Sequence, residues 1–187
     1  MTYTEIQADI AQWMHRSDLA GVIPRFIELA EEKINRLLRV RAMEIALAET
    51  PIVANRITLA ADVLDVKTLF IPGNERTPLT AQSFESVIAN GPQGIPTIYA
   101  HQGAELVFDG GGSVQGVLYQ RIPALATASS NWLSVAAPSA YLFGALEQAA
   151  LYTRDDPSVW RATFESTLSD LAANDNRRSG ALVARAR

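Results

Sequence analysis

Two histidines are the side chains in this sequence most suited to acid–base or metal chemistry. His15 falls at the end of an expected helix, and His101 falls in an expected strand region. Neither belongs to an H-x-x-H or H-E-x-x-H pattern, the spacings that bring two imidazoles to one zinc ion. We therefore expect neither a metal site nor a catalytic histidine.

Two pairs of carboxylates could in principle work as a general acid and a general base. Asp62 and Asp65 lie in an expected strand and turn, and Asp155 and Asp156 lie at an expected junction between helices. Helix capping and solvation explain aspartates at such places better than catalysis does.

Nucleophile and phosphate motifs are also missing. The glycine-rich stretch "DGGGS" (Asp109–Ser113) has no P-loop lysine and does not lead into a helix. Ser129 and Ser130 lack the G-x-S-x-G pattern, and the chain has no cysteine. We expect no enzyme activity and no cofactor.

Residues 177–187 form a cationic segment in an acidic protein. They hold no acidic residue, and because the whole chain carries a formal net charge of −4, the rest of the chain carries −8 without their four arginines. One interpretation is a frayed terminus. The other is an extended arm that becomes ordered on an acidic partner, with arginines forming charge-assisted bonds and two apolar anchors between them. The candidate binding residues are Arg177, Arg178, Leu182, Val183, Arg185 and Arg187.

Composition limits the partners. An acidic chain does not suit nucleic acid as a main, sequence-specific partner, because neutralising phosphates requires clustered basic side chains. No apolar run is long enough to span a membrane, and the opening residues do not resemble a signal peptide. All basic residues except Lys33 and Lys67 are arginines, which suit contact surfaces, although a GC-rich genome would also produce this bias.

Helical periodicity marks both ends of the chain. Thr2 and Glu5 fit a capping box ahead of a first amphipathic helix, and Asp18 is expected to cap the second. The second helix has apolar residues at three-and-four spacing from Ile23 to Leu38. The helical period returns from Pro138 and again after Pro157, and it fades near Asn174; residues 126–131 are expected to be a loop.

The middle of the chain alternates with a period of two, which indicates strands. Expected strands lie around residues 43–47, 57–59, 66–71, 97–102, 104–109 and 114–122, and a short helix is expected within 80–89. The "TP" pair, Thr50–Pro51, is expected to break the first strand, and "DGGGS" is expected to be a hairpin turn.

These patterns predict an α+β fold: a four-helix bundle formed from both chain ends, with an inserted antiparallel β lobe. Four amphipathic helices bury their apolar faces best against one another, at roughly 1.5–3 kcal/mol per large side chain. We expect N-terminal bundle helices in 1–41, the β-rich lobe in 42–131, C-terminal bundle helices in 132–176 and an extended basic tail in 177–187.

Three stretches together resemble the head-to-tail adaptor proteins of tailed bacteriophages. They are Tyr3–Ile45, which is similar to that family's first two helices and first strand, Pro96–Asp109, which is similar to its later strands, and Asn131–Leu171. In the last stretch, the positions that match the family's pattern are Trp132, Leu133, Pro138, Tyr141, Leu142, Gly144, Ala145, Leu146, Tyr152, Asp155 and Asp156.

The resemblance implies a structural virion protein of the phage neck, assembled in the host cytoplasm. Such adaptors form a ring, twelvefold in this family, that lies below the portal protein, connects it to the tail or nozzle and lets DNA pass through. Their C-terminal segment docks on the portal, which would give the arginine segment its function.

Two other hypotheses stay open. One is a different neck or tail-completion protein of similar helical design, and the other is a small carboxylate-based hydrolase or lytic factor. Rings, or co-purification with the portal, would favour the first two hypotheses. A monomer active on peptidoglycan would favour the third.

Overall fold

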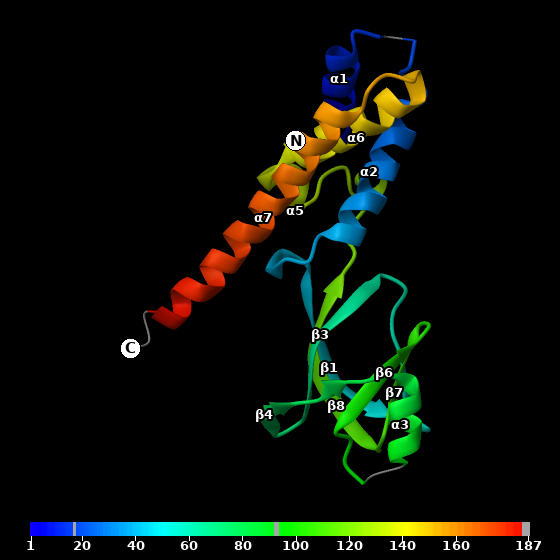
Figure 1. Ribbon diagram of the computed structural model, residues 1–187, viewed down its shortest axis with the longest axis vertical. Coiled ribbons are helices and arrows are strands. Elements are labelled where there is room, and N and C mark those ends of the chain that lie inside the picture. The colour runs from blue at the N-terminus through cyan, green and yellow to red at the C-terminus, as the bar shows by residue number, and fades with distance from the viewer. Residues whose placement is uncertain (17, 92–93, 185–187) are drawn as a thin grey trace. The chain divides into compact units, whose positions relative to one another are not determined.

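The chain divides into a helical unit and a β-rich unit, and the predicted α+β class is confirmed (Figure 1). A computed structural model describes residues 1–16, 18–91 and 94–184, without the side chains of residue 76 and of residues 178–184. The helical unit combines Met1–Ala42 with Ile122–Arg187, and the β-rich unit is Met43–Arg121.

Both ends of the chain supply the helical unit. Its helices are α1 (Tyr3–Met14), α2 (Ile23–Leu37), α4 (Leu125–Ala128), α5 (Trp132–Ala136), α6 (Pro138–Thr153) and α7 (Ser158–Ala184). A short 3-10 helix, η1 (Arg41–Met43), lies at the point where the chain passes into the β-rich unit.

Local sequence signals explain where the first helices begin. The predicted capping box of α1 is present, since Thr2 accepts a hydrogen bond from the Glu5 backbone and the Glu5 side chain accepts one from the Thr2 backbone. The predicted cap of α2 is wrong, because Asp18 pairs with Arg16 and α2 begins only at Ile23. A proline in the first turn starts α2 instead, where its missing N–H is not needed.

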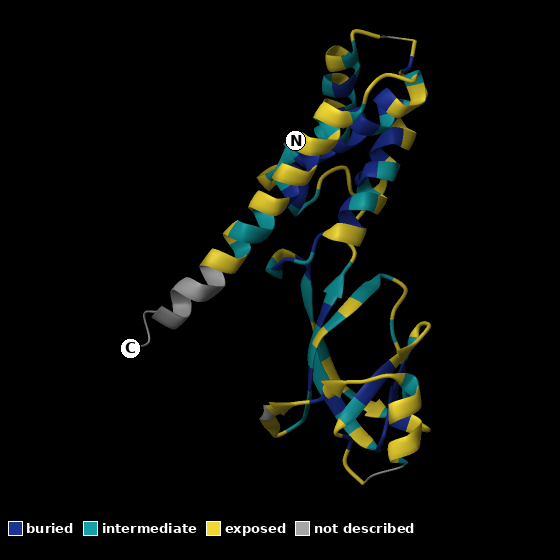
Figure 2. Ribbon diagram, in the orientation of Figure 1, coloured by how far each residue is buried: buried dark blue, intermediate teal, exposed yellow. Residues whose placement is uncertain are grey.

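Helix α6 is the centre of this unit. It packs against α1, α2 and α7, and buried residues lie all around it, among them Tyr141, Ala145, Leu146 and Ala149. Gly144 is required on this helix, because a Cβ there would lie 2.9 Å from Ala30 Cβ and 3.0 Å from Phe164 Cε2. The burial map shows the packed face of these helices in dark blue (Figure 2).

The stretch before α6 differs from the prediction. Residues 126–131 were expected to be a loop and part of the β lobe of 42–131, but most of α4 lies in this region, α5 follows directly after it, and the helical unit already begins again at Ile122. Short polar caps explain the two helices: Glu31 accepts the backbone N–H of Leu125, and the Asn131 side chain accepts that of Ser134. The cap from Glu31 comes from a distant residue and leaves no periodic trace in the sequence around α4.

The β-rich unit contains two four-stranded sheets. The first has the order β1 (Glu44–Ile52), β8 (Gly112–Gln120), β3 (Val63–Ile71), β4 (Asn74–Pro78), and all its pairs are antiparallel. The second has the order β2 (Arg56–Thr58), β7 (Glu105–Phe108), β6 (Ile98–Gln102), β5 (Thr80–Ala81), in which the β5–β6 pair is parallel. Helix α3 (Phe84–Asn90) packs on the second sheet.

Strands of both sheets contribute to one apolar core. Leu69 and Leu118 from the first sheet join Leu106 and Phe108 from the second, and all four are at least 97% buried. The opposite face of the second sheet is covered by α3 through Val87, which packs against strands β6 and β7. The two apolar faces of β7 explain why its residues do not alternate between apolar and polar.

The predicted hairpin at "DGGGS" is wrong. Strand β7 pairs with β2 and β6, and β8 pairs with β1 and β3, so the glycine stretch carries the chain from one sheet to the other. Gly112 allows this crossing with a φ of 108°, and Asp109 is turned inward and 2% exposed.

The predicted break at Thr50–Pro51 is also wrong, because β1 runs through it to Ile52. Among the described strands, β1 is an edge strand that pairs with β8 alone, with a register shift between Leu47 and Thr50. An edge strand tolerates proline, since the missing N–H need not face a neighbouring strand.

Candidate interaction surface

The side chains considered for catalysis serve local structure. Asp155 accepts the Thr153 hydroxyl, and Asp156 accepts the backbone N–H and the hydroxyl of Ser158 at the start of α7. His15 is the left-handed C-cap of α1. Within the described residues, no three histidine or acidic side chains come together in a way that could hold a metal ion.

The other candidates are likewise structural. Asp62 accepts the side-chain amide of Gln120, and Asp65 accepts the backbone N–H that follows it. Ser129 is the left-handed C-cap of α4. The carboxylates of Asp62 and Asp65 are therefore engaged in local hydrogen bonds at the start of β3.

Helix α7 carries four of the predicted binding residues, Arg177, Arg178, Leu182 and Val183, and a buried carboxylate holds its first half. Glu147 of α6 has a side chain 3% exposed and accepts bonds from Lys33 Nζ of α2 (2.7 and 3.0 Å) and from Arg161 Nε of α7 (2.9 Å). Lys33 also lies 4.9 Å above the Phe164 ring. Three helices are thus joined through one residue.

The charge state of Glu147 follows from these contacts. Burial would raise the pKa of its carboxyl, but hydrogen bonds from Lys33 and Arg161 and their positive charges lower that pKa overall. Glu147 is therefore ionised at neutral pH and compensated by two cations.

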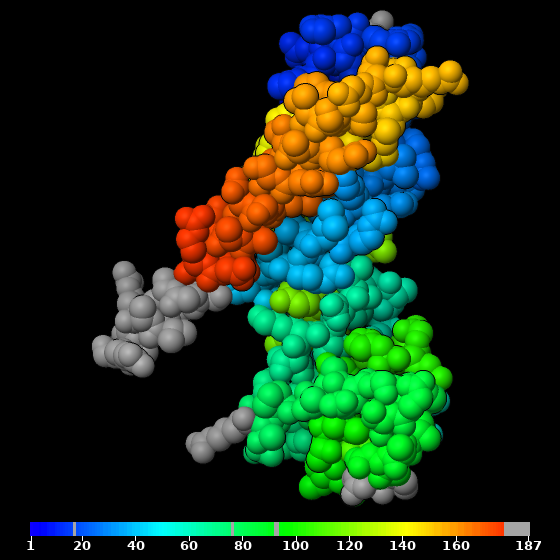
Figure 3. Space-filling view, in the orientation of Figure 1, coloured from blue at the N-terminus to red at the C-terminus, as the bar shows by residue number. Residues whose placement is uncertain are grey.

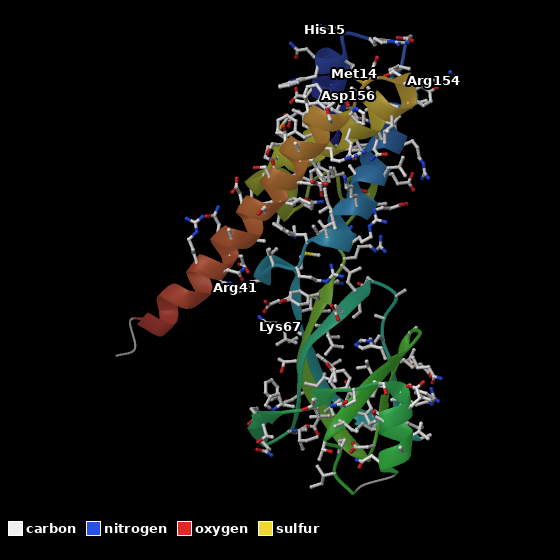
Figure 4. All side chains as sticks on the ribbon, in the orientation of Figure 1. Met14, His15, Arg41, Lys67, Arg154 and Asp156 are labelled. Carbon is white, nitrogen blue, oxygen red and sulfur yellow. The ribbon has the colours of Figure 1, made fainter. Side chains whose placement is uncertain are left out.

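A second set of hydrogen bonds, between Arg41 and Asp175, holds the C-terminal half of α7, and we call it the Arg41–Asp175 clasp. The Asp175 carboxylate accepts the Arg41 backbone N–H (3.1 Å) and Arg41 Nε (3.0 Å), and the Asp175 carbonyl accepts an Arg41 guanidinium N–H (3.2 Å). Figure 4 shows Arg41 beside this part of the helix. The helix is therefore anchored two residues before the cationic segment begins.

The cationic segment is not extended where the structure describes it. Helix α7 continues to Ala184, so the prediction of an extended tail over 177–187 is wrong for 177–184. The segment contains no proline, and alanine, leucine and arginine favour helix enough to offset Gly180, which costs about 1 kcal/mol.

The predicted site residues are placed to different extents. Arg177 is exposed, and it has no ion pair with any other described residue. The backbones of Arg178, Leu182 and Val183 lie in α7. Arg185 and Arg187 lie outside the described residues. Figure 3 shows α7 along the outside of the helical unit.

A groove lies beside the C-terminal half of α7. It has a volume of about 640 Å³ and is bounded by α7, α5 and the segment that follows α2. Its apolar lining is Val40, Ala42, Trp132, Ala136 and Leu171, with Asn174, Asp175 and Arg177 at its polar side. The sequence prediction missed this groove, because its lining comes from three separate stretches of the chain.

The other two tryptophans form an aromatic cluster. Trp13 and Trp160 have ring centroids 5.7 Å apart, and each also contacts Phe143. Trp13 is 49% exposed, so part of the aromatic surface of this cluster is open to solvent.

An exposed arginine on an anchored helix, an apolar groove beside it and a partly exposed aromatic cluster are features suited to binding another protein. Residues 1–186 match the family described as SU10 adaptor protein, and the chain belongs to this family of phage head-to-tail adaptors. A comparison with curated proteins gives no match. None of the described helices combines the length and apolarity of a membrane span.

Proposed function

We propose that this protein is a virion component that forms a ring, twelvefold in stoichiometry, below the portal and connects the portal to the tail or nozzle. It acts by binding alone and needs no cofactor. Twelve subunits related by rotation would meet through heterologous contacts that close a ring, and DNA would pass through its channel without sequence-specific recognition.

The portal contact is assigned to the C-terminal end of α7. The observation that carries this assignment is the exposed Arg177 directly after the Arg41–Asp175 clasp, followed along the helix by Arg178, Leu182 and Val183. Arginine forms strong, directional bonds with carboxylates, and twelve copies of a weak contact bind with high avidity. Arg185 and Arg187 complete the proposed arm.

Helices α1, α2, α6 and α7 are proposed to act as one four-helix bundle in the ring. The packing of α6 on the other three supports this grouping. A bundle of this kind gives each arm a rigid base, so that twelve arms can reach their portal sites together.

A different neck or tail-completion protein of the same helical design is the alternative. Both roles need assembly on the virion, so the partner that is captured separates them. The adaptor role requires the portal protein itself to bind.

Deletion of residues 177–187 tests the proposal. The truncated chain should keep its melting temperature and lose only the helical circular dichroism signal of residues 177–184, but it should no longer co-purify with the portal protein. Arg185→Glu with Arg187→Glu should weaken the same contact, and added salt should weaken it further, since exposed charges are screened within about 8 Å at physiological ionic strength. Undiminished portal binding by the truncated chain would refute the arm.

A further inference from the structure

We infer that the groove beside α7 is the second half of the portal contact: it receives an apolar side chain of the portal protein that is flanked by a carboxylate. This inference rests on the proposed function. It adds a preformed surface to the arm and specifies the chemistry of the partner segment.

The lining of the groove selects an apolar group. Its apolar lining combines Trp132 and Ala136 of α5 and Leu171 of α7 with Val40 and Ala42 of the segment that follows α2. Ala42 and Ala136 are exposed, and their methyl groups are part of the apolar lining of the groove. About 640 Å³ is within the usual size of a binding cleft and holds several side chains.

The charge at the rim selects a carboxylate. Asp175 also lines the groove, but Arg41 occupies its carboxylate through two bonds, so the pair is close to neutral. Arg177 also lines the groove, two positions after Asp175. No described residue forms an ion pair with Arg177. The open charge of the groove is therefore positive, which complements an acidic residue of the partner.

A protein segment fits this combination better than nucleic acid does. A phosphate backbone would use clustered cations and gain little from the apolar lining made by Trp132, Leu171 and Val40. An apolar anchor with a neighbouring carboxylate uses both features, in the manner of a central hot spot with a polar rim.

The anchored part of α7 makes the groove a preformed site. Leu171 and Asp175 lie on one helix, and the three bonds between Arg41 and Asp175 hold this helix against the segment that carries Val40 and Ala42. Both walls are thus in place before a partner arrives, so little ordering opposes binding.

Placing a carboxylate in the groove tests the inference. In the full-length chain, Ala136→Glu should weaken binding to purified portal protein at least tenfold, measured by biolayer interferometry, and Arg177→Glu should do the same. Ala162→Glu is the matched control, because Ala162 is also an exposed helical alanine but lies on the first half of α7 and outside the groove. Ala42→Glu provides a second groove variant if Ala136→Glu lowers the melting temperature.

A tryptophan readout locates the contact. With Trp13→Phe and Trp160→Phe, Trp132 is the remaining tryptophan and lines the groove. Portal binding should shift its emission maximum. A shift on adding DNA in place of the portal would overturn the inference, as would dissociation of the ring by Ala136→Glu with portal affinity retained, which would make the occupant a second copy of this chain.

The results for the arm and for the groove can be told apart. Deletion of 177–187 could abolish portal binding while Ala136→Glu and Ala42→Glu both bind within twofold of Ala162→Glu. In that case the groove inference fails and the proposed function stands. If the truncated chain still binds the portal, the proposed arm fails first.

Discussion

At the scale of the residue, the Glu147 carboxylate of α6 joins α2 and α7 to α6 through its bonds to Lys33 and Arg161. A buried carboxylate with two cationic partners is worth little compared with an apolar core, but removing one member leaves buried charge uncompensated. The side chain of Lys33 is 17% exposed, so its ammonium would lose its main partner without access to much water. Arg161 is 48% exposed and would be resolvated more easily.

Glu147→Gln should therefore lower the free energy of unfolding by about 3 kcal/mol at neutral pH, measured by urea denaturation. The folded-state pKa of this carboxyl is lowered, so its stabilisation is present above the ordinary glutamate pKa of about 4.3 and is lost as pH falls through the lower folded value. The difference between wild type and variant should shrink toward pH 3. Glu165→Gln on exposed α7 surface is the control, and an equal loss in both would contradict the role of Glu147.

Gly144 of α6 allows close packing against Ala30 of α2 and Phe164 of α7, and a larger residue there would clash. Gly144→Ala would improve helix propensity by about 1 kcal/mol, but its Cβ would press on Ala30 and on the fully buried Phe164 ring, at a cost of about 1–3 kcal/mol. The net result should be a lower melting temperature in differential scanning calorimetry. Gly21→Ala, where nothing lies within 4 Å, should change it little; a stabilised Gly144→Ala variant would show that the helices can move apart.

At the scale of the element, the second half of α7 depends on one clasp. Beyond Leu168 this helix has no fully buried side chain among those described, so the bonds between Arg41 and Asp175 supply most of its anchoring. Arg41→Ala should speed backbone hydrogen exchange in residues 169–184 by about fivefold, corresponding to roughly 1 kcal/mol, and leave α6 unchanged. Arg36→Ala, an exposed arginine of α2, is the control, and equal exchange in the two variants would rule out the clasp.

The elements that could be predicted from the sequence are those whose cause is local. The three-and-four spacing in α2 and the Thr2–Glu5 box of α1 each involve residues within a few turns, so the pattern is visible. The glycine stretch after β7 was misread, because a turn sequence does not reveal which sheet the next strand joins. Sheet partners are chosen by contacts far apart in the chain.

The candidate surface was only partly predictable for the same reason. Arg177 stands out by composition, while Glu147 has no signal in a single sequence, since its partners Lys33 and Arg161 lie on other helices. The end of α7 was misjudged because its apolar period weakens near Asn174, although helix continues without a buried stripe when the chain has no proline and is anchored at Asp175.

At the scale of the whole molecule, the two units of the chain have separate supports. All three tryptophans belong to the helical unit, whereas the β-rich unit depends on Asp109. The Asp109 carboxylate is 2% exposed and accepts bonds from the backbone N–H groups of Thr97 and Ile98, the Thr97 hydroxyl and the Asn90 amide. Burial would raise the pKa of Asp109, but these hydrogen bonds lower it.

Asp109→Ala should consequently separate the unfolding of the two units. The buried donors left without an acceptor cost about 2–3 kcal/mol, and this cost falls on the β-rich unit alone. In urea, the loss of far-ultraviolet circular dichroism should begin at a lower concentration than the change in tryptophan emission, which reports only the helical unit. Phe164→Ala should act in the opposite sense and move the tryptophan transition, at about 3–5 kcal/mol. Coincident transitions in both variants would mean that the two units unfold as one cooperative body, and would contradict the separate supports of the helical unit and the β-rich unit.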